Sequence, residues 1–244
     1  MIIEEGKTSP AALIVDNIDY DKDPGFIFLM LAHATEIKHR KFVKKIIHSE
    51  DTFFNNKVSS HDEYLGTASS LITELRDTEN HPVENLANIK YLLDSLFLLI
   101  TQKGSLKYEY RRDYLHRSES ICKNLGISKS TLSRYVKLGL EVTDATSHYR
   151  YPAHVTYYWH NALWASRIQA LYQAFKLRNR TTIDIIKELQ EENKKYETNH
   201  ADKSFYDVYA NIENPDELEE PDEYYDWKDI IEELEELQNE NKSE

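Results

Sequence analysis

The sequence predicts a mainly α-helical protein in three parts: a helical N-terminal domain, a central helix-turn-helix with a small β-wing, and an acidic, largely disordered C-terminal tail. Three observations lead to this prediction. The 244 residues include only 6 glycines and 6 prolines. Apolar residues recur at helical spacing over long stretches, which is the pattern of helices with one buried face. Charge is unevenly distributed along the chain, and the last part is strongly acidic.

Residues 1–104 are expected to form the helical N-terminal domain. Residues 11–18 are apolar and short, which suits a strand or an extended arm. Helical patterns follow at 26–54, 61–79 and 83–102. The last of these places Leu86, Ile89, Leu93 and others on one face, as a core helix does. A glycine and a serine at 104–105 mark the expected boundary, and the sequence assigns no role to this domain.

The central part of the chain is basic, although the whole chain has a net charge of −13. Residues 103–183 carry 14 Lys and Arg against 5 Asp and Glu, whereas the segments on either side are acidic. Residues 146–183 contain no acidic residue at all. A local excess of positive charge is typical of a surface that contacts phosphates.

The segment from Glu119 to Tyr135 has the pattern of a helix-turn-helix. A first short helix carries Ile121 inward, Gly126 permits a sharp turn, and Ser128 can cap a second helix that carries Leu132 inward. The second helix is expected to end near Gly139, a natural position for a C-terminal glycine.

The outward positions of the second helix are cations and hydrogen-bond donors, the side chains that a helix needs in a major groove. Within this motif we expect contacts to DNA from Ser128, Lys129, Ser130, Thr131, Ser133, Arg134 and Lys137. Lys129, Ser130, Ser133 and Arg134 would read bases, and Lys137 would hold a phosphate. Arg111, Arg112 and Arg117 precede the motif and suit phosphate contacts, or pairing with the acidic parts of the chain.

A turn-rich, β-prone segment over 140–152 predicts the β-wing, with Tyr149 and Arg150 in it. Helices are expected from about Val155 to Phe175 and from Thr181 or Thr182 to about Tyr196, the latter with a threonine cap. Together with the motif these make a DNA-binding domain over 105–199.

The motif resembles the winged helix-turn-helix of the MerR and excisionase superfamily. Gly126, Ile127, Ser128, Thr131, Leu132, Tyr135, Gly139 and Leu140 stand at the matching steps, and Tyr149 and Arg150 stand where the wing signature falls. The resemblance covers about residues 115–190. It implies a recognition helix in the major groove, a wing on phosphates and a homodimer on an inverted repeat. The chain departs from the family at Ser133, Val136 and His148, and in the hundred residues that precede the motif.

Residues 200–244 are expected to be a mobile acidic tail, since residues 211–244 hold 15 acidic residues against 2 lysines. A short amphipathic helix is predicted within it, from Trp227 to Leu237. The tail suits three roles: it keeps the chain in solution, it shields the basic surface, or it docks this helix on a protein partner.

The sequence gives no support to catalysis, to a cofactor or to a metal site. Phosphate loops and nucleophile motifs are missing, and one cysteine cannot form a thiolate zinc site. The N-terminus lacks a basic signal segment, and the longest apolar run is too short for a membrane span. We therefore expect a cytoplasmic, nucleoid-associated protein without membrane partners.

The leading hypothesis is a homodimeric, sequence-specific transcription regulator that binds double-stranded DNA. One alternative is an architectural DNA-binding protein of a plasmid or phage, acting in partition, replication or excision. The other is a protein–protein interaction adapter that acts through its acidic tail. The DNA sequence, the effector and the choice between activator and repressor stay open at this level.

Overall fold

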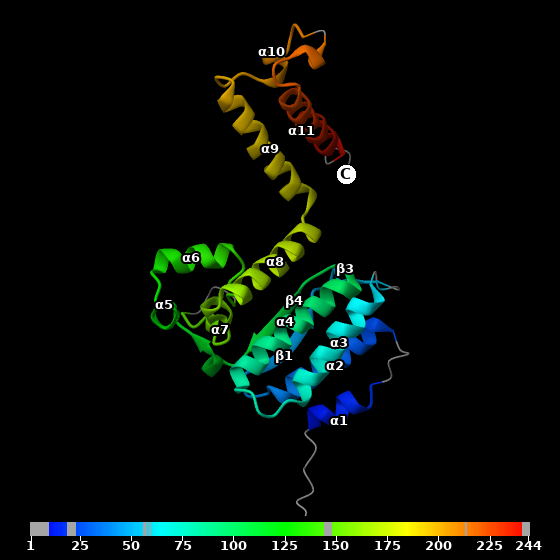
Figure 1. Cartoon of the computed structure of the whole chain (residues 1–244), viewed down its shortest axis with the longest axis vertical. Helices are drawn as coiled ribbons and strands as arrows, with labels where there is room; N and C mark the ends of the chain where they lie inside the picture. The colour runs from blue at the N-terminus through cyan, green and yellow to red at the C-terminus, as the bar shows by residue number, and fades with distance from the viewer. Residues whose placement is uncertain are drawn as a thin grey trace, which may run out of the picture. The chain divides into compact units, whose positions relative to one another are not determined.

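The structure is a computed structural model that describes residues 10–18, 23–55, 58, 60–143, 148–212 and 214–240. The chain divides into two compact units, Met1–Asn179 and Arg180–Glu244 (Figure 1). This division differs from the expected boundaries after residues 104 and 199. Strand pairing explains the first difference: β1 (Val43–His48) pairs with β4 (Leu106–Tyr110) across the expected boundary at 104.

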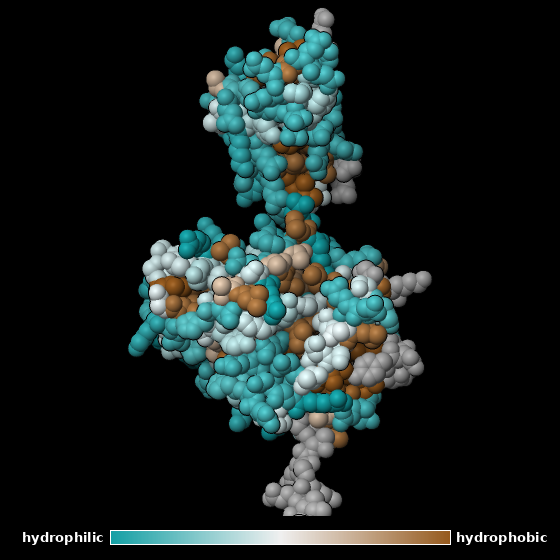
Figure 2. Space-filling model, in the orientation of Figure 1, coloured by the Kyte–Doolittle hydropathy of each residue, from teal (hydrophilic) through white to brown (hydrophobic). Residues whose placement is uncertain are grey.

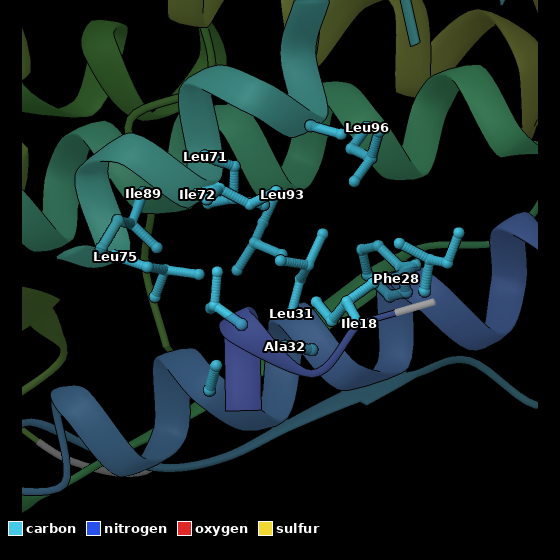
Figure 3. Close-up of a cluster of buried hydrophobic side chains, with 14 of the residues drawn as sticks. Ile18, Phe28, Leu31, Ala32, Leu71, Ile72, Leu75, Ile89, Leu93 and Leu96 are labelled. Atoms are coloured by element: carbon cyan, nitrogen blue, oxygen red, sulfur yellow. The ribbon is translucent and has the colours of Figure 1, made fainter. Parts of the chain in front are cut away.

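Four helices form the core of the first unit: α1 (Pro10–Asp16), α2 (Pro24–Lys38), α3 (His61–Arg76) and α4 (Pro82–Ile100). Leu31, Leu71 and Leu93, one from each of the last three helices, are fully buried, and Figure 3 shows them pointing toward one another. Asp23 and Ser60 cap α2 and α3 by accepting backbone N–H groups. The predicted helices at 61–79 and 83–102 are confirmed as α3 and α4.

Two predictions for the N-terminal domain were wrong. Residues 11–18 were expected to be a strand or an arm, but residues 11–16 form most of α1, which buries Ala11 and Val15 against α2 and α3. The predicted helix at 26–54 ends at Lys38, and β1 follows it. The β-branched residues of β1 suit a strand, and the antiparallel partner β4 supplies the backbone hydrogen bonds that decide the outcome.

Small two-stranded antiparallel sheets join the ends of the helices. β2 (Phe53–Phe54) pairs with β3 (Thr101–Lys103), and β5 (Leu115–His116) pairs with β6 (Tyr151–Pro152). Gly104 follows β3 with a φ of +112°, a conformation that side chains disfavour, and a Cβ there would lie 2.4 Å from the Thr52 hydroxyl. This glycine is therefore a tight turn inside the first unit.

The rest of the first unit contains α5 (Ser118–Leu125), α6 (Lys129–Lys137), α7 (Val155–His160) and α8 (Ala162–Arg178). The helix predicted over 155–175 is interrupted at Asn161, which has extended backbone angles and caps α8 through the N–H groups of Leu163 and Trp164. Arg178 at the end of α8 donates to the carbonyls of Leu98, Thr101 and Gly104. These bonds fix α8 to the end of α4.

The second unit is helical: α9 (Thr182–Asn199), α10 (Phe205–Val208), a 3₁₀ turn (Pro215–Glu217) and α11 (Pro221–Glu240). The predicted threonine cap of α9 is confirmed, because Thr181 and Asp184 form a reciprocal capping box. α11 packs along α9. The surface of the second unit in Figure 2 is mostly hydrophilic.

The prediction of a largely disordered tail does not hold for the described part of residues 200–240. Trp227 of α11 is fully buried, stacks on Tyr196 and His200 at ring distances of 5.3 and 5.1 Å, and donates from Nε1 to Asn193. Phe205 completes this aromatic core at 5.5 Å from Trp227. The apolar face of the predicted helix is therefore used inside the unit, although its outer face is strongly acidic.

Among the described residues, none of the helices combines the length and the apolar character that crossing a membrane requires.

Candidate nucleic-acid interface

Helices α5 and α6 are joined by a tight turn at the position that the sequence predicts. Gly126 ends α5 with left-handed backbone angles, φ +66° and ψ +33°. The N–H of Ile127 then donates to the carbonyl of Cys122. Ser128 begins α6 and accepts the N–H of Thr131 at 3.1 Å. A left-handed glycine and a capping hydroxyl thus set the angle between the two helices.

The inner faces of α5 and α6 share a small hydrophobic core. Ile121 and Leu132 are fully buried there, together with Leu140, Tyr151 and Val155. The predicted inward positions are therefore confirmed. This packing leaves the opposite face of α6 in solvent.

The outer face of α6 carries cations and hydroxyls. Five of its side chains are exposed and recur at helical spacing: Lys129, Ser130, Ser133, Arg134 and Lys137. We call these five residues the α6 face. Lys129 forms an exposed ion pair with Glu119 of α5, with 2.9 Å between Nζ and Oε1. A competing anion can displace such a solvated pair at little cost.

The hydroxyl of Ser128 is engaged within the protein. Besides capping α6, it lies 2.8 Å from the Ser130 hydroxyl and 3.0 Å from that of Thr131. Thr131 is also only partly exposed. Of the predicted DNA-binding residues, Ser128 and Thr131 therefore position α6, whereas the side chains of the α6 face are exposed to solvent.

The C-terminal end of α6 is held by close packing. Gly139 has a φ of +105°, and a Cβ at this position would lie 2.6 Å from Cβ of Tyr172 in α8. Tyr135 of α6 stacks on Trp159 of α7 with ring centroids 4.3 Å apart. Helix α6 is thus braced by both α7 and α8.

A second group of predicted residues gathers around Tyr149. The guanidinium of Arg117 lies 4.5 Å from the Tyr149 ring centroid, and that of Arg112 lies 5.5 Å from it. We call Arg112, Arg117 and Tyr149 the arginine–tyrosine group. Arg150 instead turns to Tyr151, and Arg111 donates from Nε to the carbonyl of Arg40. Arg111 is thus committed to the backbone of the N-terminal part.

Part of the predicted wing lies outside the described residues, namely 144–147. On either side of that stretch, the N–H of Thr143 donates to the carbonyl of Arg150, and the N–H of Arg150 donates to the carbonyl of His116. Residues 150–152 therefore lie between Thr143 and β5. This pairing holds the arginine–tyrosine group against the start of α5.

Sequence reasoning missed a cluster of buried polar side chains between α4, β4 and the segment after α6. We call it the buried polar cluster, and its members are Lys90, Asp94, Tyr108, Tyr110, Tyr114, Glu141 and His154. Lys90 lies 2.6 Å from Asp94 and 3.6 Å from Glu141. The sequence signal was the pair Lys90 and Asp94, which are four residues apart within the mainly apolar stretch 89–100.

Glu141 of the buried polar cluster has a lowered pKa. Its carboxylate accepts hydrogen bonds from Tyr110 at 2.9 Å and is 2.9 Å from Nε2 of His154. Burial alone raises the pKa of this carboxyl, but the charge of Lys90 and the bonds from His154 and Tyr110 outweigh it and lower the pKa from 4.5 to about 2. Glu141 is therefore ionised at neutral pH.

Comparison of the chain with family models, curated proteins and solved structures gave no match.

Proposed function

We propose that the protein is a sequence-specific DNA-binding transcription regulator that places α6 in the major groove. The observation that carries the proposal is the α6 face: five exposed donors and cations on a helix whose other side is buried and whose two ends are fixed. A helix that only covered a core would need no such concentration of donors on its solvent side. A recognition helix needs that concentration.

The α6 face divides into base readers and a phosphate contact. Lys129 and Ser130 lie in the first turn, the part of a recognition helix that reaches base edges. Arg134 follows on the same face, and its planar guanidinium suits the O6 and N7 atoms of guanine. Lys137 lies in the last turn, where a phosphate contact is expected.

The arginine–tyrosine group supplies a second set of phosphate contacts in this proposal. Arg112 and Arg117 are exposed, and stacking on Tyr149 restricts their conformations before any DNA is bound. Arg150 directly follows Tyr149 in the chain. Contacts of this kind set the register of a protein on the duplex without reading its sequence.

The first experiment selects binding sites for the full chain from a random duplex library, then measures affinity by fluorescence anisotropy at several salt concentrations. We expect a defined consensus and an affinity that falls steeply with salt. The absence of any DNA binding at low salt would contradict the proposal. A consensus built from two inverted half-sites would support a homodimer.

Single variants then distinguish side chains that contact bases from side chains that contact phosphates. Arg134→Ala should lower the affinity for the selected site by about fivefold to 100-fold and relax the sequence preference. Lys137→Ala should weaken all sequences alike and make the salt dependence less steep. The control is Arg40→Ala, which removes an exposed arginine of the N-terminal part. Equal losses for Arg40→Ala and Arg134→Ala would show that only net charge matters.

The folded acidic unit favours a second candidate function, that of an adapter for a basic protein partner. Residues 180–240 are compact and strongly acidic, so they can present a fixed negative surface. The apolar face of α11 is not available for docking, because Trp227 and Leu234 are buried within the unit. Partner capture that survives nuclease treatment and needs residues 180–244 would favour this function.

A further inference from the structure

A cavity lies next to the buried polar cluster within the first unit. Its volume is about 400 Å³, a size typical of small-molecule sites. Side chains from α4, α6, α7 and α8 and from the segment after α6 line it. Its walls are mainly apolar and include Val136, Leu140, Trp159, Ile168, Leu171 and Phe175.

One side of the cavity is polar. Lys90, Asp94 and Glu141 line it, and these three groups already pair with one another and with neighbouring tyrosines. This side of the cavity thus contains one ammonium group, that of Lys90, and two carboxyl groups, those of Asp94 and Glu141. A ligand with a negative charge would therefore meet carboxylate oxygens without a free cation to compensate it.

Trp159 forms part of the cavity wall. Its Nε1 is buried and has no hydrogen-bond partner among the described residues, although Trp159 itself lines the cavity. This N–H is enclosed by protein atoms, so Trp159 contributes its apolar ring face to the wall of the cavity.

We propose that this cavity binds an uncharged, mainly apolar small molecule. The apolar walls contact the molecule, and the polar side excludes anions. The proposal does not rest on DNA binding, because its test measures ligand binding alone.

The position of the cavity also gives the ligand a direct path to α6. A molecule there contacts Val136 of α6 and Trp159, the residue that stacks on Tyr135 of the same helix. Gly139, where α6 meets α8, is part of the wall as well. Occupation of the cavity therefore acts on the packing that holds α6 in place.

The test uses the full chain and the uncharged dye Nile red, whose fluorescence rises on entering an apolar site. We expect saturable binding that Leu171→Arg weakens by roughly tenfold or more, since the arginine places a charge and a longer side chain in the cavity. The matched control is Leu163→Arg on the same helix, because Leu163 is 61% exposed and lies outside the cavity. Circular dichroism checks that both variants fold.

Two further measurements test ligand binding in the cavity even if Leu171→Arg fails to fold. Trp159→Phe removes part of the apolar wall and should weaken Nile red binding by about fivefold. Competition should show displacement by 2-nonanone, whereas octanoate, of the same shape but anionic, should be roughly tenfold less effective. Unchanged binding in Leu171→Arg and Trp159→Phe, or equal competition by the two molecules, would overturn the proposal.

Discussion

Replacing Glu141 with glutamine should destabilise the first unit at neutral pH, and the loss should disappear in acid. The carboxylate of Glu141 is held by Lys90, Tyr110 and His154, and its pKa is about 2 instead of the usual 4.5. Because the folded state favours the ionised form, the stabilisation is complete above about pH 4.5. It is lost as the pH falls through about 2.

The size of the effect follows from the shift. The fall of the Glu141 pKa from 4.5 to about 2 corresponds to about 3 kcal/mol of stability at pH 7. Glutamine keeps an acceptor for Tyr110 but leaves Lys90 with only Asp94 as a charged neighbour. A loss of about 3 kcal/mol also agrees with the usual cost of breaking a buried ion pair from one side.

The assay is urea unfolding of wild type and Glu141→Gln between pH 3 and pH 7, followed by tryptophan fluorescence. Transitions of the two units are fitted separately, because Trp227 reports on the second unit. The difference between the two proteins should narrow as the pH falls below 4.5. The control is Glu109→Gln, an exposed change on β4 expected to cost less than about 0.5 kcal/mol. A constant difference across this pH range, or one below about 1 kcal/mol at pH 7, would refute the reasoning.

Three further changes test the packing around α6 and in the second unit. Gly139→Ala should lower the free energy of unfolding by about 2 kcal/mol or more, measured by thermal unfolding, because Gly139 has a positive φ and lies against Tyr172. The control is Gly66→Ala on the open face of α3, which should be neutral or stabilising. Ser128→Ala should cost about 1 kcal/mol of unfolding free energy through the lost cap, and an unchanged midpoint would show that the cap contributes nothing. Trp227→Ala should cost about 3–5 kcal/mol and expose the amides of α11 to rapid hydrogen exchange, which a disordered tail would show already in the wild type.

Local signals explain why α5, α6 and the cap of α9 were predictable. A left-handed glycine, a capping serine or threonine and apolar residues at helical spacing act within about ten residues, so they are visible in the sequence alone. Gly126, Ser128 and Thr181 each do in the structure what their residue types indicate. The inward positions Ile121 and Leu132 follow from the same spacing.

The wrong predictions concern segments whose structure depends on partners far away in the sequence. The strand at Val43–His48 depends on β4, more than fifty residues later, and its sequence also suits the end of a helix. The acidic tail has the composition of a disordered segment, yet Trp227, Tyr196, His200 and Phe205 provide a core that composition does not reveal.

The sequence by itself determined the helical class, the turn between α5 and α6, and the residues of the α6 face, because all of these depend on near neighbours along the chain. Only the tertiary structure decided which of the predicted DNA-binding side chains remain free to contact DNA. In it, Ser128 caps α6, Arg111 donates to a backbone carbonyl, and Arg112 and Arg117 stack on Tyr149. It also brought Lys90 and Glu141 together beside a cavity, since only folding can place residues fifty positions apart in one buried site.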